Sequence, residues 1–303
     1  MKIIKDKFTW IDIINPTPKD VEYLRKIYPR FHPVILDELL HTSARSMVER
    51  DEHYLFFTYH LPTYDSKTKT SQKTEIDFLV TKNVLITVHY EEMDPLNDFF
   101  KKLNQDKEFK KMALRENTGK LIYYLVEELL LFSQRQLHHI EEDVFAITKE
   151  LFRKEEEKLL EKISYIKRNI LDYRIITKPQ EIILYSLKEA GTAFWSQDMR
   201  IYFSDLMGDH LKVMQQLDNF KETVESLEAT NAQLLTAKTN AVVQRFSVIA
   251  FLTFPLILVI GLFTVPAIDR IFENSSAFFA IAFIGALAFI IGLFALFRNK
   301  KWL

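Results

Sequence analysis

The chain has 303 residues, of which 48% are hydrophobic and 27% charged, and its formal net charge is −1. This near-neutral charge argues against a nucleic-acid-binding protein, and the absence of cysteine excludes disulfides and thiolate metal sites. The sequence holds no phosphate-binding glycine loop and no nucleophile motif with a supporting base, so we expect no enzymatic activity.

The first 118 residues alternate short strand-like and helical segments and predict an α/β domain. Prolines at Pro18 and Pro33 favour helix starts, because proline is tolerated in the first turn of a helix. The chain opens without the apolar stretch of a signal peptide, so we expect this domain in the cytoplasm. The strands are expected at residues 10–13, 54–59, 76–80 and 84–89.

Residues 119–198 show helical periodicity and predict a helical, coiled-coil-like region. Within it, His138 with Glu142 and His139 with Asp143 form pairs at i,i+4 spacing, a geometry able to hold a divalent ion. A solvated acidic helix face explains the same residues, and the sequence implies no third ligand. We therefore assign no site to them.

No proline occurs between Met199 and Pro255, which predicts one helix of about 65 residues, roughly 100 Å long. Its cytoplasmic part, the stalk, covers residues 199–245. The apolar positions of this stalk would be poorly covered in a monomer, so they predict an oligomer. These positions include Leu206, Val213, Leu217, Phe220, Val224, Leu227, Leu234 and Leu235.

Two uncharged runs near the end of the chain are each long enough to cross about 30 Å of hydrocarbon as a helix. Arg245 and Arg298 flank them, whereas the connecting loop holds only Arg270 among basic residues, which favours both termini inside the cell. We expect a first span at 246–268, an extracytoplasmic loop at 269–275, a second span at 276–297 and a basic cytoplasmic tail at 298–303.

Spacings of three and four place one uncharged stripe of residues on a single face of the first span. Polar and small side chains in such a stripe are consistent with a narrow pore that is gated by dewetting. A helix-packing seam is the alternative, because small residues also favour close helix contacts in membranes. The stripe consists of Asn240, Val243, Ser247, Ala250, Phe254, Ile257, Gly261 and Thr264.

Several segments, in order, are similar to one known family: Trp10-Ile11-Asp12, the run at 32–38, Thr63-Tyr64-Asp65, Lys238-Thr239-Asn240 and Gly261-Leu262-Phe263. They resemble the CorA family of divalent-cation channels. The resemblance implies an α+β membrane protein of the inner membrane and a funnel-shaped homopentamer whose first transmembrane helix lines the pore. It also implies Mg²⁺ as the default substrate and as regulator, with cobalt, zinc or another divalent cation as the alternative substrate, and no organic cofactor. The implied partners are the bilayer, divalent cations and copies of the chain, with no nucleic acid.

The resemblance further implies a regulatory metal site between subunits, with Asp65 and Asp205 as its acidic residues. The family's Gly-Met-Asn signature, however, falls here on Thr264-Val265-Pro266, and valine and proline cannot reproduce a ring of amide oxygens. Two further interpretations stay open for this reason. One is a pore of altered selectivity, which passes zinc with proton coupling, cations with less selectivity, or anions; the other is a non-conducting pentameric metal sensor or scaffold.

Overall fold

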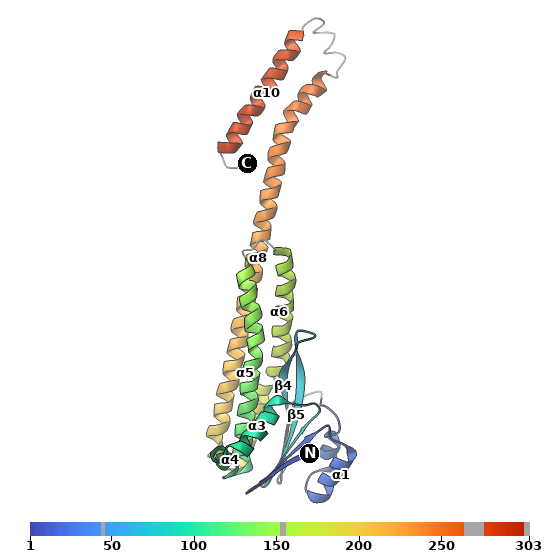
Figure 1. The fold of residues 1–303 in the computed structure, drawn as a ribbon, viewed down its shortest axis with the longest axis vertical. Helices are drawn as coiled ribbons and strands as arrows, with labels where there is room; N and C mark the ends of the chain where they lie inside the picture. The colour runs from blue at the N-terminus through green and yellow to red at the C-terminus, as the bar shows by residue number, and fades with distance from the viewer. Residues whose placement is uncertain (44–45, 152–155, 264–275, 300–303) are drawn as a thin grey trace. The chain divides into compact units, whose positions relative to one another are not determined.

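A computed structural model describes residues 1–43, 46–151, 156–263 and 276–299. The chain divides into two compact units, Met1–Glu228 and Ala229–Leu303, and each is described by itself. Figure 1 shows the strands and the shorter helices of unit 1 gathered in one α/β domain, with α5 and α6 extending from it.

Unit 1 is built on a six-stranded mixed sheet with the strand order β1-β2-β6-β5-β4-β3. Strands β2 and β6 run parallel, and the other neighbouring pairs are antiparallel. The long β4–β5 hairpin keeps one register from Leu55↔Val80 to Asp65↔Thr70. The strands are β1 (Lys2–Lys5), β2 (Thr9–Ile14), β3 (Val48–Arg50), β4 (Leu55–Asp65), β5 (Thr70–Val80) and β6 (Val84–His89).

One face of the sheet is covered by α1 (Pro18–Ile27) and α2 (Pro33–Glu38). Helix α1 begins with a capping box in which Thr17 and Asp20 exchange hydrogen bonds, followed by proline in the first turn. Residues 11, 13, 79, 86 and 88 of the central strands pack with these helices into one apolar cluster. The predicted helix starts are confirmed, but α2 ends at Glu38 rather than His41.

The opposite face is covered by α3 (Asp94–Gln105), α4 (Lys107–Leu114), α5 (Thr118–Glu150) and α7 (Gln180–Phe194). The larger apolar cluster of the chain fills this layer, with Trp10, Phe57 and Phe78 from the strands. Both faces of the sheet are therefore buried, and the central strands are almost continuously buried, including polar residues such as Thr58, Glu75 and Asp77.

Helix α8 (Met199–Phe263) is one unbroken helix of 65 residues, as expected from the sequence. Its first part packs in unit 1 beside α5 and α6 (Glu156–Thr177), where Arg174 Nη1 binds Asp218 Oδ1 at 2.6 Å. Lys167 Nζ binds Glu228 Oε2 at 2.7 Å further along. These contacts hold the helix against its own chain.

The sequence predicts that the apolar positions of this stalk are poorly covered in a monomer, and this prediction is wrong for most of those positions. Five of the eight expected positions are at most 8% exposed, because the helices of the same chain cover them. Other large apolar side chains are exposed, among them several on the three successive helices α6, α7 and α8. They include Leu171 and Ile175 of α6, Ile182 and Tyr185 of α7, and Ile201 and Leu211 of α8.

The sheet also differs from the sequence-based expectation at its edges. Strands β4 and β5 each have 11 residues and extend well past the expected segments, and the short edge strands β1 and β3 were not expected. Edge strands need only a partner strand and carry little apolar periodicity, so their sequences look like loops.

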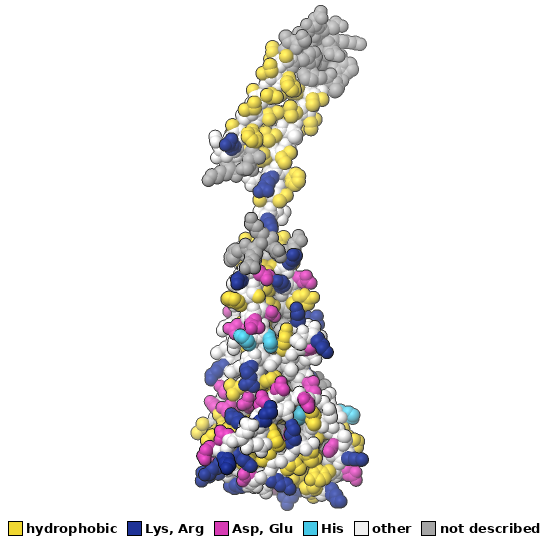
Figure 2. All heavy atoms as spheres, viewed as in Figure 1, with side chains coloured by type: hydrophobic (Ala, Val, Ile, Leu, Met, Phe, Trp, Pro, Cys, Tyr) yellow, Lys and Arg dark blue, Asp and Glu magenta, His cyan; other side chains and the backbone are white. Residues whose placement is uncertain are grey.

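Unit 2 contains the rest of α8 and the helix α10 (Ser276–Asn299). In the described residues, α8 contains a stretch long and apolar enough to cross a membrane, and a shorter apolar helix covers Phe283–Asn299. Figure 2 shows hydrophobic side chains over most of the described surface of unit 2, whereas charged side chains are spread over unit 1. Surface of this kind is not stable in water without lipid or protein partners.

Candidate functional site

The uncharged stripe on α8 is continuous and exposed in the single chain. Every described member from Asn240 to Gly261 is exposed, and Phe254 and Ile257 are 64% and 65% exposed. Neighbouring faces of the helix are also exposed, so exposure alone does not separate a pore from a lipid-facing surface. What distinguishes the stripe is the presence of the amide of Asn240 and the hydroxyl of Ser247 among apolar groups.

The stripe begins at the polar residue Asn240, and its last described member is Gly261. Ser247 Oγ donates to the carbonyl of Val243 at 2.9 Å, so its lone pairs remain the outward-facing polar feature of that turn. The distance from 240 to 261 corresponds to roughly 30 Å of helix, the thickness of the hydrocarbon layer. Thr264, Val265 and Pro266, where the selectivity motif is expected, lie outside the described residues.

Asp65 ends β4, and both of its carboxylate oxygens are used within the hairpin. Oδ1 accepts from the Lys67 amide at 2.9 Å, and Oδ2 accepts from Thr68 Oγ1 and Gln72 Nε2, both at 3.0 Å. These hydrogen bonds, the Lys67 amide first, lower the pKa of Asp65 below its ordinary value. The group is therefore an ionised carboxylate held in a fixed place, with lone pairs left for a cation.

Asp205 lies on an exposed turn of α8, where its Oδ2 accepts from Tyr123 Oη at 2.8 Å. The same hydroxyl lies 3.3 Å from Oε1 of Glu127 on α5. Burial raises the pKa of Glu127, and the neighbouring charges of Asp205 and Asp209 act in the same direction. The structure thus adds Glu127 to the region of Asp205, a neighbour that sequence spacing does not reveal because 78 positions separate the two residues.

No hydrogen bond or ion pair joins Asp65 to Asp205 in the part of the chain that the structure describes. That part also contains no group of three or more acidic or histidine side chains able to hold a metal ion. In the single chain Asp65 therefore has its partners in the β4–β5 hairpin, and Asp205 has its partner on α5.

His138 and His139 make different contacts in the structure. His138 contacts Glu141 at 3.2 Å and Glu142 at 3.3 Å on an exposed face of α5. His139 instead stacks on Tyr64, with ring centroids 4.2 Å apart, next to the hairpin turn. The arrangement fits a solvated acidic face and a hairpin contact.

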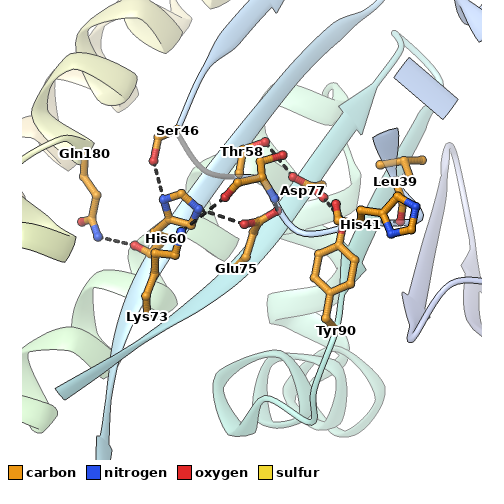
Figure 3. A network of polar contacts seen from close by, with 11 residues as sticks. Leu39, His41, Ser46, Thr58, His60, Lys73, Glu75, Asp77, Tyr90 and Gln180 are labelled. Atoms are coloured by element: carbon orange, nitrogen blue, oxygen red, sulfur yellow. Dashed lines mark hydrogen bonds and ion pairs between the residues drawn. The ribbon is translucent and has the colours of Figure 1, made fainter. Parts of the chain in front are cut away.

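A buried polar network lies on the α2 side of the sheet (Figure 3). His60 of β4 contacts Glu75 of β5 at 3.0 Å through Nε2 and Ser46 at 2.7 Å through Nδ1. Glu75 Oε1 accepts from the Ser43 amide at 2.7 Å, so the network also holds the loop after α2. From the other side of the strand, Gln180 Nε2 of α7 donates to the His60 carbonyl.

The same network continues to Asp77, which is 1% exposed. Its Oδ1 accepts from Thr58 Oγ1 at 2.7 Å, and its Oδ2 lies 2.8 Å from Tyr90 Oη (Figure 3). The pKa of Asp77 is raised to about 7, chiefly by burial and also by the charge of Glu75, against the opposing hydrogen bonds from Thr58 and Tyr90. The network has a structural role, since its carboxylates are enclosed between the sheet and α2.

Trp10 and Asp12 also have structural roles. Trp10 Nε1 donates to Thr87 Oγ1 at 3.0 Å, and Thr87 Oγ1 donates to Asp12 Oδ1 at 2.7 Å. His89 Nε2 lies 3.3 Å from the same carboxylate. This chain of contacts satisfies buried polar atoms that join β2 to β6.

Comparison with known proteins gives a consistent result over the whole chain. A family profile described as "CorA-like Mg2+ transporter protein" matches residues 5–300. The chain is 22% identical over 298 residues to the "Cobalt/magnesium transport protein CorA" of Thermotoga maritima, covering 97% of this chain and 83% of that protein.

Solved structures share the fold at low sequence identity. The complete structure of the CorA magnesium transporter from Methanocaldococcus jannaschii matches with a TM-score of 0.81 and 17% identity, covering 100% of this chain and 94% of that one. The full-length CmaX protein matches with a TM-score of 0.75 and 16% identity, covering 100% and 91%. The α/β domain and the long helix are thus arranged in a known fold.

Proposed function

The chain belongs to the CorA family of divalent metal ion transporters, membrane proteins that are not enzymes, and we propose that it forms a channel for Mg²⁺. The profile match through residues 5–300 is the observation that carries this proposal, because it includes both apolar helices. The relative from Thermotoga maritima is named for cobalt and magnesium, so Co²⁺ is the second ion expected to pass.

In this proposal five copies of the chain surround a pore in the inner membrane, with both termini in the cytoplasm. The stripe from Asn240 to Gly261 lines the pore, and the side chains of Phe254 and Ile257 form its apolar constriction. An apolar constriction closes by losing its water, and the polar groups at Asn240 and Ser247 give a hydrated cation places to pause. The exposed apolar side chains of α6, α7 and α8 support an oligomer, because contact with another copy of the chain would cover them.

A second candidate is favoured by one observation, the sequence Thr264-Val265-Pro266 in place of Gly-Met-Asn. Mg²⁺ sheds water reluctantly and is suited to a ring of amide and carbonyl oxygens. Without that ring the pore selects differently, for zinc, other cations or anions, or it does not conduct and the protein acts as a metal sensor.

The test is ion flux in liposomes that contain the purified full-length protein. We expect Mg²⁺ and Co²⁺ uptake that falls at least tenfold in Asn240→Leu, because leucine removes the polar group from the stripe. Ala241→Leu is the matched control, since it adds the same side chain about 100° around the helix.

Chloride and Zn²⁺ are measured in the same liposomes. Selective flux of either one without Mg²⁺ would establish altered selectivity. No flux for any ion, in protein that still assembles, would leave the sensor as the function.

A further inference from the structure

A cavity of about 480 Å³ lies at the edge of unit 1, and neither Asp65 nor Asp205 lines it. It is formed between the loop after β1 and helix α4. Figure 2 shows Lys and Arg side chains at the end of unit 1 where Figure 1 places α4. The lining residues are Asp6, Lys7, Lys107, Lys110, Lys111, Leu114 and Arg115.

The fold holds the basic side chains of this cavity in place. Helix α4 begins at Asp106, whose carboxylate accepts from the Phe109 amide at 2.9 Å, and it buries Phe109 and Ala113 in the core. Its positively charged face is therefore turned away from the core. Lys7 Nζ donates to the carbonyls of Arg115 at 3.0 Å and Glu116 at 3.5 Å, which ties the β1–β2 loop to the end of the helix.

These positive charges are poorly compensated. Among the described residues, no ion pair includes Lys107, Lys110, Lys111 or Arg115. The only lining carboxylate, Asp6, accepts from the backbone amide of Lys7 at 2.8 Å.

Two nearby acids offset only part of this positive charge. Glu116 binds Lys120 at 2.6 Å, and Glu108 lines an adjoining cavity with Lys111 and Arg115. Like charges at i,i+4, as in Lys107, Lys111 and Arg115, destabilise a helix. The fold places five cations around one cavity although the repulsion between them is destabilising. Such a cavity is suited to an anionic ligand.

We propose that this cavity binds a compact polyphosphate, such as pyrophosphate or the phosphate chain of a nucleoside triphosphate. Two adjacent phosphates carry roughly three to four negative charges, which the five cations can balance. Lysine ammonium groups act as point charges for phosphate oxygens, and an arginine guanidinium can bind two of them at once. The ligand class follows from the charge and size of the cavity and does not depend on ion transport.

Isothermal titration calorimetry of the full-length protein in neutral phosphatidylcholine nanodiscs tests the proposal. The probes are pyrophosphate, ATP and orthophosphate, without Mg²⁺. We expect pyrophosphate and ATP to bind more tightly than orthophosphate and to weaken with rising salt, because the contacts are partly exposed. In Lys110→Gln with Lys111→Gln, the Kd for pyrophosphate should rise at least tenfold, or about 1.4 kcal/mol.

Lys19→Gln with Lys26→Gln on α1 is the matched control, because it removes the same charge from exposed residues without changing the cavity. Lys107→Gln with Arg115→Gln is a second test pair at fully exposed positions, used if the half-buried Lys110 is needed for folding. No pyrophosphate binding at millimolar concentration would overturn the proposal. So would equal weakening in the test and control pairs, or binding of anionic phosphatidylglycerol vesicles but of neither soluble probe.

Discussion

The hydroxyl of Tyr90 has one hydrogen and three acceptors within reach. It lies 2.8 Å from Asp77 Oδ2, 2.8 Å from the His41 carbonyl and 3.3 Å from the Leu39 carbonyl. If Asp77 is protonated, its carboxyl group donates to Tyr90 and Tyr90 donates to the loop after α2. The raised pKa of Asp77 agrees with that arrangement, and the carboxyl proton then helps to hold the loop against the sheet.

The stability of unit 1 should therefore depend on the protonation of Asp77. Its pKa rises from an ordinary 3.8 to about 7 on folding, so the stabilising contribution is complete below pH 4 and is lost as pH rises through 7. The full difference corresponds to about 4 kcal/mol. We expect Asp77→Asn to remove this pH-dependent contribution to the free energy of unfolding. The difference in Tm between wild type and variant should therefore change between pH 5 and pH 8.

Thermal unfolding in detergent at several pH values measures this difference. Because other groups titrate equally in both proteins, subtracting the two pH profiles isolates Asp77. Parallel profiles across this range would show that the carboxyl group stays ionised in the folded protein.

At the scale of elements, the packing of α7 on α8 depends on a close approach at Gly191. A Cβ at this position would overlap the ring of Phe203 and lie 3.0 Å from Cζ3 of Trp195. Phe203 is 1% exposed, so its ring has no free space to move into. The glycine lets the start of the long helix pack against the helix before it.

Gly191→Ala should lower Tm by several degrees, because overpacking costs about 1–3 kcal/mol. Gly208→Ala on α8 is the matched control, since nothing lies within 4 Å of a Cβ there and alanine favours helix by about 1 kcal/mol. Both Tm values come from the same thermal scan. Equal Tm values for the two variants would show that the contact between α7 and α8 has room for a methyl group at position 191.

For the whole molecule, we propose that Asp65 of one copy lies near Asp205 of the next, as the resemblance to the CorA family implies. Two carboxylates about 4 Å apart repel by about 1 kcal/mol in water and about 4 kcal/mol at a protein surface. A divalent ion between them would cancel this repulsion and hold neighbouring copies together. Repeated at five interfaces, this gives internal Mg²⁺ a way to close the channel.

Mg²⁺ inside the liposomes should therefore reduce flux through the wild-type channel, and Asp65→Ala and Asp205→Ala should each make flux insensitive to it. The measurement is the flux of Co²⁺ at increasing internal Mg²⁺. Asp98→Ala serves as the control, because Asp98 is an exposed carboxylate paired with Lys101 on α3. Unchanged inhibition in both variants would remove the two aspartates from the regulatory site.

Features that depend on neighbours in the chain could be predicted from the residues alone. The starts of α1 and α2 follow from proline in the first turn, and the 65-residue helix follows from the lack of proline before Pro255. The resemblance to the CorA family also rests on short ordered segments, and the family profile confirms it.

Features that depend on residues far apart in the chain could not be predicted in this way. The sequence predicts that eight apolar positions of the stalk are poorly covered in a monomer, yet helices of the same chain bury five of them. The contact of Tyr123 with Asp205 joins residues 82 positions apart, and Lys7 reaches the end of α4 across 108 positions. Periodicity shows that a helix has an apolar face, but not what covers it, because burial and charge balance arise only when separate elements pack.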